Sequence, residues 1–509
     1  MDKKKSTINI SVSIIGKLVI LFFTLCTRRL IIKYLGNDIN GVNSLYTSII
    51  GFLAVAELGV GSAITFSMYK PIVKNETEKI IALYQLYKRI YLIIGGIILF
   101  AGLCIIPFLP YLAKDYGNIK INFSLTFILA LIAVVCSYLY SAKTSLINAY
   151  KNNYLTSLAH VGGIVIQSCL QILVLTIYRS FELYLIAHII GTLTQYIITS
   201  WIAKRKYKNI IRHEKLSIDI DTKNEIIKNV KAMFLHKVGT VFVNSTDSII
   251  ISSVVGLAIL GKYSNYTTLI TAMISIIILF FTSLTSIVGH MFVKESKKDM
   301  ESWFEVFYYI NYFLAFVCFL GFYSIIDEVI VLFFGMSLQL NKIIVMTITM
   351  NYFIQFMRQA ALLFRDASGN FYYDRWKPII EGGVNIILSI LLAVILPEDY
   401  KVVGVIIATI ITNLLICHIV EPHIIYKYAF ETSAYKYIVR NYLLIILFFL
   451  MLNLFDLLRF YSENIWGSII INGLISIAIS LIVIFSFILL NKDLRVKLKR
   501  LLTSEPTRS

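Results

Sequence analysis

Apolar residues run through the chain in long stretches that are separated by short clusters of polar and charged residues. Each stretch is about twenty residues long, the length that an α-helix needs to cross a bilayer. The stretches are continuously apolar, whereas a strand of a membrane barrel alternates. The pattern therefore predicts an all-α integral membrane protein with about fourteen transmembrane helices. The predicted spans are residues 10–34, 43–69, 88–112, 122–146, 154–177, 181–203, 229–254, 264–292, 305–327, 341–363, 378–396, 402–426, 441–459 and 466–490.

Lys and Arg are distributed very unevenly among the connections between these spans. The two tails and the connections after even-numbered spans, counted with the adjoining ends of the spans, hold 34 of the 47 basic residues, and the connections after odd-numbered spans, counted in the same way, hold 8. Because basic loops stay on the cytoplasmic side of a membrane, we expect both termini to be cytoplasmic. The largest connection, residues 204–228, lies on the same side, between the sixth and seventh spans.

The composition agrees with a membrane protein and limits the other possibilities. Hydrophobic residues make up 58% of the chain and charged residues 15%. The net charge of +18 is explained by basic loops that face an anionic leaflet, so no nucleic-acid partner is expected. The six cysteines lie inside apolar runs without a CxxC pair, which indicates neither a disulfide framework nor a metal site. We expect no cofactor and no catalytic residues, because no triad or carboxylate pair falls on an external loop.

An internal repeat relates the two halves of the chain. When the sequence is shifted by 220 residues, residues 15–51 align with residues 235–271 without a gap, and ten of the 37 pairs are identical. The identical pairs include Lys17 with Lys237 and Gly36 with Gly256. Both copies begin in the cytoplasm, so the repeat is parallel. Transporters built from parallel repeats bind substrate between the halves and work by alternating access.

The repeat and the loops together predict the domain organisation. We expect an N-terminal six-helix lobe over residues 1–203, a cytoplasmic linker over 204–228 and a second six-helix lobe over 229–426. Residues 427–509 then add two further transmembrane helices and a basic cytoplasmic tail.

Ionisable side chains inside the spans are the candidate functional residues, because a charge within a bilayer is costly. The basic candidates are Lys17, Arg28, Lys237 and Arg358, which we predict to form a cationic substrate-binding cavity. Lys17 and Arg28 are eleven residues apart and share one helix face. The alternative for these two cations is that they extend toward the headgroups on either side.

Two acidic residues, Glu57 and Asp247, also lie inside predicted spans. They are candidates for coupling transport to H⁺ or Na⁺. For Asp247, a structural ion pair explains the position equally well.

With these residues in place, the chain resembles the polysaccharide-unit flippases, which are the O-antigen and capsule translocases of the multidrug/oligosaccharidyl-lipid/polysaccharide exporter (MOP) superfamily. The resemblance covers essentially the whole chain. The segments that carry it are Arg28–Tyr46, Ala56–Ile64, Thr246–Tyr266, Asp366–Pro378 with Glu381, and Gly404–Thr409.

The resemblance implies two six-helix bundles around a central basic cavity, with two extra C-terminal helices. It also implies a bacterial cytoplasmic membrane protein that moves an undecaprenyl-diphosphate-linked oligosaccharide from the inner to the outer leaflet. A monomer is expected, with possible association with polymerase machinery.

Three other functions are compatible with parts of the sequence. A flippase for the peptidoglycan lipid precursor shares the anionic diphosphate and is poorly separated by sequence. A cation-coupled multidrug exporter would favour an acidic cavity, against the basic candidates here. A membrane polysaccharide polymerase or glycosyltransferase would need a long external loop, and the external connections are all short.

Overall fold

The computed structural model describes residues 3–57, 60–114, 116–211, 245–370, 373–491 and 495, and throughout these ranges every regular element is a helix. By their contacts the residues form two compact units. Unit 1 comprises residues 1–264 and 378–401, and unit 2 comprises residues 265–377 and 402–509.

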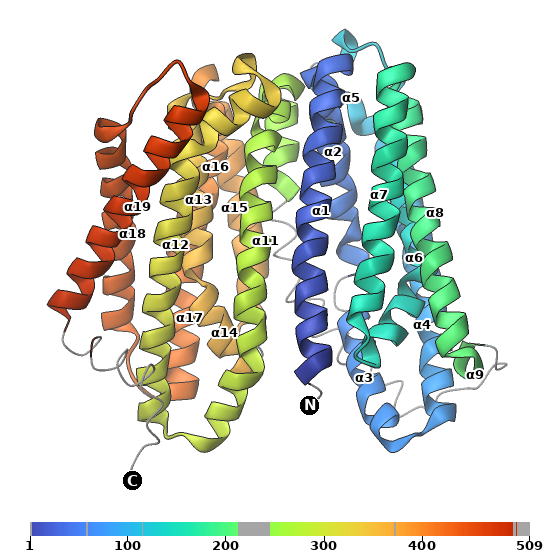
Figure 1. Cartoon of the computed structure of the whole chain (residues 1–509), viewed down its shortest axis with the longest axis horizontal. Coiled ribbons are helices and arrows are strands. Elements are labelled where there is room, and N and C mark those ends of the chain that lie inside the picture. The colour runs from blue at the N-terminus through green and yellow to red at the C-terminus, as the bar shows by residue number, and fades with distance from the viewer. Residues whose placement is uncertain are drawn as a thin grey trace. The chain divides into compact units, whose positions relative to one another are not determined.

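Unit 1 is built mainly from the N-terminal half of the chain (Figure 1). Helix α8 packs along α7 and α6, while α7 also packs against α1 and α6 against α4. The unit contains α1 (Lys3–Leu35), α2 (Asn37–Leu53), η1 (Ala54–Glu57), α3 (Val60–Lys74), α4 (Thr77–Ile105), η2 (Ile106–Phe108), α5 (Leu109–Leu112), η3 (Tyr116–Asn118), α6 (Phe123–Ala149), α7 (Asn153–Ile177), α8 (Phe181–Lys206), α9 (Lys208–Ile211), a helix over Ser245–Val255 that ends in the π-turn η4 (Ile251–Val255), nearly all of α15 (Lys377–Ile395), and η7 (Glu398–Tyr400).

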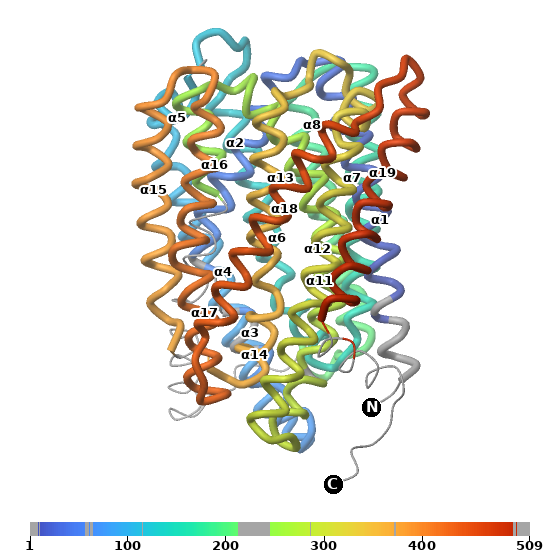
Figure 2. Tube along the Cα trace, turned by 90° about the vertical axis from the view of Figure 1, so that its left-hand side faces the viewer, coloured from blue at the N-terminus to red at the C-terminus, as the bar shows by residue number. Residues whose placement is uncertain are grey.

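Unit 2 is organised around the long helix α12, which packs against α19 and α13 (Figure 2). The unit contains most of α11 (Leu257–Lys294), then α12 (Lys297–Phe334), η5 (Met336–Leu338), α13 (Lys342–Met357), α14 (Gln359–Ser368), α16 (Lys401–Thr412), η8 (Asn413–Cys417), α17 (His418–Ile425), η9 (Tyr426–Phe430), α18 (Tyr435–Leu458) and α19 (Ile465–Leu490).

Ten of the described helices are long and apolar enough to cross a membrane, and they coincide with ten of the predicted spans. The other predicted spans fall on α1, on α2 with α3, on residues 229–254, which are described only from Ser245, and on α13 with α14. Large apolar side chains such as Leu457 and Leu490 are more than four-fifths exposed. Such a surface is stable in lipid and not in water, so the predicted all-α membrane fold is confirmed.

Two of the predicted continuous spans are interrupted in the structure. The span over 43–69 changes from α-helix to the 3₁₀ turn η1 at Ala54, so that Glu57 closes that turn. The span over 341–363 breaks at Arg358, which separates α13 from α14. Both interruptions place an ionisable side chain where the regular α-helical hydrogen bonding of the backbone stops. Such irregular backbone inside a membrane often lines a binding site.

The internal repeat is visible at one turn in each copy. Gly36 ends the first helix of one copy with φ 93° and ψ 162°, and Gly256 has φ 137° and ψ 165° at the equivalent turn. Only glycine adopts such conformations readily. The turns also pack on each other within unit 1. A Cβ on Gly41 would overlap the carbonyl oxygen of Leu257, and a Cβ on its repeat partner Gly261 would overlap the carbonyl oxygen of Asn37. The contact is therefore reciprocal, as a pseudo-two-fold relation requires.

Candidate functional site

Arg28 is held at the repeat turn of unit 1. Its Nη1 donates to the hydroxyl of Ser264 at 2.8 Å, and that hydroxyl donates to the carbonyl oxygen of Gly261 at 2.9 Å. Arg28 is half-buried, whereas the adjacent Arg29 is exposed. The structure therefore separates the two arginines as the helical spacing predicts.

Lys17, the other basic candidate on α1, is also half-buried. It lies between Leu18 and Gly16, on a stretch where Leu18 is half exposed and Gly16 packs closely against α7. Its repeat partner Lys237 lies outside the described residues. The predicted contribution of these two lysines to a cationic cavity stays a prediction.

Asp247 lies in a buried polar layer of unit 1. The side chains at positions 245–247 are all buried in the helix Ser245–Val255. The Thr246 hydroxyl contacts Oδ1 of Asn385 on α15 at 3.4 Å, and Asn385 is completely buried. Glu381, one turn before Asn385, is 6% exposed. Carboxylate, hydroxyl and amide oxygens of this kind suit a hard cation, but no group of three or more His, Cys, Asp or Glu suited to a metal occurs among the described residues.

Glu57 is surrounded by tyrosines. The Tyr91 hydroxyl donates to its Oε1 at 3.4 Å. Tyr91 packs edge-on against Tyr87 and stacks on Tyr138, with ring centroids 5.0 Å and 5.9 Å apart. The Tyr87 hydroxyl donates to the carbonyl of Gly61, just beyond the break in the helix. The carboxylate thus lies among phenol groups that can donate hydrogen bonds to it, at a point where the helix is interrupted.

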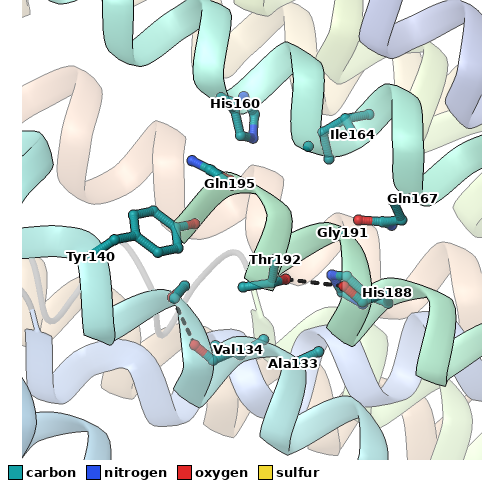
Figure 3. A pocket seen from close by; sticks show the side chains of 12 residues that line it. Ala133, Val134, Tyr140, His160, Ile164, Gln167, His188, Gly191, Thr192 and Gln195 are labelled. Atoms are coloured by element: carbon teal, nitrogen blue, oxygen red, sulfur yellow. Dashed lines mark hydrogen bonds between the residues drawn. The ribbon is translucent and has the colours of Figure 1, made fainter. Parts of the chain in front are cut away.

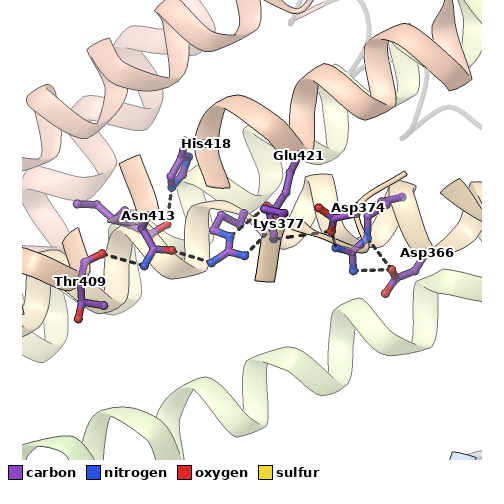
Figure 4. A network of polar contacts seen from close by, with 10 residues as sticks. Asp366, Asp374, Lys377, Thr409, Asn413, His418 and Glu421 are labelled. Atoms are coloured by element: carbon purple, nitrogen blue, oxygen red, sulfur yellow. Dashed lines mark hydrogen bonds and ion pairs between the residues drawn. The ribbon is translucent and has the colours of Figure 1, made fainter. Parts of the chain in front are cut away.

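Arg358 belongs to an ion-pair network inside unit 2 (Figure 4). Its Nε and Nη2 donate to the two carboxylate oxygens of Glu421 at 3.0 and 2.5 Å, and its Nη1 donates to Oδ1 of Asn413 at 2.7 Å. This two-pronged geometry is the strongest form of an arginine–carboxylate pair. Arg358 is 14% exposed and Glu421 1% exposed.

The network continues beyond Arg358 through buried groups. Lys377, the first residue of α15, also donates to Glu421, and its Nζ lies 3.7 Å from Asp374. Asp374 accepts from Arg365, whose guanidinium also donates to Asp366 at 2.8 Å. Figure 4 shows Asn413, Glu421, Lys377, Asp374 and Asp366 in one row. Each charge in the row faces an opposite one.

Neutral polar groups extend the same region. His418 Nε2 lies 3.0 Å from the carbonyl oxygen of Ile354, and its Nδ1 lies 2.8 Å from the Asn441 amide nitrogen. Tyr308 donates to Oδ1 of Asn441 at 3.0 Å. His418, Asn441 and Tyr308 are all buried. This chain of bonds ties α12, α17 and α18 together.

Sequence reasoning named Arg358 but missed its partners. Glu421 was the detectable one, because it is a carboxylate inside the predicted span 402–426. Asp374 and Lys377 lie in the segment Asp366–Pro378 that carries the family resemblance, without a role assigned from sequence. The ion pair could not be predicted from the sequence, because Arg358 and Glu421 are 63 positions apart. The substrate-binding role of Arg358 stays a prediction, and in the structure its guanidinium is bonded to Glu421 and Asn413.

The arrangement in both units is suited to binding and charge compensation. The charged residues of the unit 2 network are bonded to one another, while in unit 1 Arg28 bonds to the Ser264 hydroxyl and Glu57 accepts from the Tyr91 phenol.

Comparison with known proteins concerns the fold. No protein-family model matches the chain, and no curated protein matches its sequence. The lipid II flippase MurJ in an inward closed conformation matches with a TM-score of 0.62 and 15% identity, over 94% of this chain and 98% of that one. An inward-facing multidrug-resistance MATE transporter matches with a TM-score of 0.55 and 13% identity, over 80% and 96% of the two chains. The Vibrio cholerae MATE transporter VcmN matches with a TM-score of 0.54 and 14% identity, over 82% of this chain and 97% of that one. The chain therefore has the MOP-superfamily fold.

Proposed function

We propose that this chain is a flippase that carries an oligosaccharide linked to undecaprenyl diphosphate from the cytoplasmic to the outer leaflet of a bacterial cytoplasmic membrane, by alternating access. The observation that supports this most is Arg28, a half-buried guanidinium that donates to the Ser264 hydroxyl in a fold shared with flippase and exporter structures. A guanidinium in this setting suits a diphosphate, because it presents several donors to phosphate oxygens.

The physics of the substrate agrees with this function. A sugar headgroup cannot cross hydrocarbon unaided, since each hydroxyl without a hydrogen bond costs several kcal/mol. A polar path through the protein removes that cost while the lipid chain stays in the bilayer. Outward movement of the diphosphate is favoured by an inside-negative potential, by about 2.3 kcal/mol per charge and per 100 mV. The proposal therefore needs no nucleotide-hydrolysing domain.

Lys17 and Lys237 would add positive charge to the same path. Asp247, with Thr246 and Asn385 beside it, and Glu57, with its tyrosines, are the proposed sites for a coupling H⁺ or Na⁺. Both acids lie inside the fold next to groups that can accept or donate hydrogen bonds. Binding or release of H⁺ or Na⁺ at either carboxylate would therefore change the local charge directly.

A flippase for the peptidoglycan lipid precursor is the second candidate. The observation in its favour is the match to the lipid II flippase MurJ, which extends over 98% of that chain. A multidrug exporter is less favoured, because the basic candidates suit anions. An enzyme is not proposed, since the matched structures are transporters and flippases.

The test is a leaflet assay in cells depleted of the protein. Lipid-linked oligosaccharides are labelled, and an impermeant reagent reports which of them face outward. We expect cytoplasmic accumulation that wild type reverses. Arg28→Ala should slow flipping by about ten- to a hundred-fold, the effect of losing one charged hydrogen-bonding partner.

Arg29→Ala is the matched control, because Arg29 is the exposed neighbour on the same helix. Equal rescue by both variants would reject the role of Arg28 and keep the function. Outward-facing but unpolymerised units in depleted cells would reject flipping. Accumulation of the peptidoglycan precursor in place of other lipid-linked sugars would select the second candidate.

A further inference from the structure

A polar cavity lies inside unit 1, between α6, α7 and α8. Its volume is about 160 Å³. The polar side chains in its wall are those of Ser137, Tyr140, His160, Gln167, His188, Thr192 and Gln195 (Figure 3). All three helices fall within predicted membrane spans, so this polar wall stands at the depth where polar groups are costly. A ligand or water must compensate for it.

Two glycines bring the walls of the cavity together. A Cβ on Gly191 of α8 would overlap the side chain of Gln167, and a Cβ on Gly163 of α7 would stand 3.0 Å from the carbonyl oxygen of Gly191. The backbones of α7 and α8 are therefore in direct contact at this level, as small residues permit in membranes. Gln167 and Gln195 lie on either side of this contact.

The polar side chains in the wall are open to a ligand. Across the described ranges, the side chains of Tyr140, His160, Gln167, His188 and Gln195 make no hydrogen bond to the protein, while the Thr192 hydroxyl bonds only to the carbonyl oxygen of His188 on its own helix, at 3.1 Å. Figure 3 shows the Tyr140 ring and the Gln195 amide extending into the space below His160. Five hydrogen-bonding side chains thus face one cavity.

The chemistry of the wall selects an uncharged ligand with many hydroxyl groups. None of the twelve residues that line the cavity is Asp, Glu, Lys or Arg, so the wall carries no permanent charge and only its two histidines can become charged. The glutamine amides both donate and accept hydrogen bonds, as a sugar hydroxyl does. Tyr140 offers a flat apolar face. A cavity of about 150 Å³ accommodates one benzene ring, so the space admits at most one ring and not an oligosaccharide.

We propose that this cavity binds a single uncharged pyranosyl ring of the transported glycan. The inference rests on the proposed flippase function and adds a specificity site to it. Arg28 would bind the diphosphate, and the cavity would select a neutral sugar. Glycans whose ring at this position carries a carboxylate would be excluded, because the wall has no cation to pair with it.

The test uses the full chain, purified and reconstituted in lipid nanodiscs. Saturation-transfer NMR measures binding of methyl glucoside, galactoside, mannoside and N-acetylglucosaminide, with methyl glucuronide as the charged comparison. We expect saturable binding of at least one neutral glycoside and none of the glucuronide. Gln167→Leu and Gln195→Leu should each weaken binding at least ten-fold, and Gln355→Leu, on α13 of unit 2, should leave it unchanged.

A second arm separates this inference from the proposed function. Gln195→Leu should slow flipping of a lipid-linked unit, and the matching free glycoside should compete. Flipping that is normal in Gln195→Leu, together with no binding of neutral glycosides, would overturn the cavity inference and leave the flippase function standing. Binding of glycosides without any flipping of lipid-linked sugar would show that the cavity binds a free sugar, and would overturn the claim that its ligand is a ring of a transported glycan. Proton uptake at the histidines without sugar binding would identify a hydrated proton site and overturn the inference.

Discussion

The polar cavity of unit 1 and the ion-pair network of unit 2 differ in how their buried polar side chains are compensated. Both place polar groups within predicted membrane spans. In unit 2, Arg358 and Lys377 face Glu421, and Arg365 faces Asp374, so the charges are compensated within the protein. In unit 1, Gln167 and Gln195 carry no charge and make no bond to another described group. The difference indicates that the ion-pair network of unit 2 is built for stability and the cavity of unit 1 for a ligand.

Energetics support this division. A buried ion pair gains little over apolar packing, but removal of one partner leaves a charge without compensation. Replacement of an uncharged amide that bonds to no other protein group costs little stability, because it leaves no protein partner unpaired. Mutations should therefore separate the two regions by the size of their effect on stability.

Glu421→Gln should have the largest effect. It leaves both Arg358 and Lys377 without their carboxylate, and we expect a loss of about 3–5 kcal/mol in the free energy of unfolding. The measurement is denaturant unfolding of the purified protein in micelles. Asp366→Asn is the control, because the Asp366 side chain is 53% exposed. A Glu421→Gln protein as stable as wild type would remove the structural role of the network.

Gln167→Leu and Gln195→Leu should change stability by less than about 1 kcal/mol, since each removes a polar group that has no protein partner to strand. Unfolding under the same conditions checks this, with the loss of glycoside binding as the independent readout. If either variant lost as much stability as Glu421→Gln, the cavity would be a structural element of the same kind as the network.

Lys297→Met should have the smallest effect. Lys297 pairs with Glu431 at 2.6 Å, but both side chains are more than half exposed. Surface pairs contribute about 0.2–1 kcal/mol and are screened by salt. We expect a change within that range at low salt that vanishes at high salt. A larger, salt-independent change would mean that exposure does not separate the two kinds of pair.

Much of the architecture could be predicted from the chain. Long apolar runs must become helices in lipid, because no other element satisfies its own backbone groups there. The internal repeat could also be detected in the sequence. Its paired glycines, Gly36 and Gly256, both have positive φ in the structure, a conformation that other residues rarely adopt.

Partnership between distant residues was decided only by the tertiary structure. Arg358 looked like a substrate cation from sequence, and the fold brings Glu421 and Asn413 to it. His160 and His188 are 28 positions apart in the sequence, and the close contact of α7 and α8 at Gly163 and Gly191 places both in one cavity wall. Sequence determines which residues enter the membrane, because hydrophobicity and helical period are local properties. Which polar groups then meet depends on how helices pack, and that is a property of the whole fold.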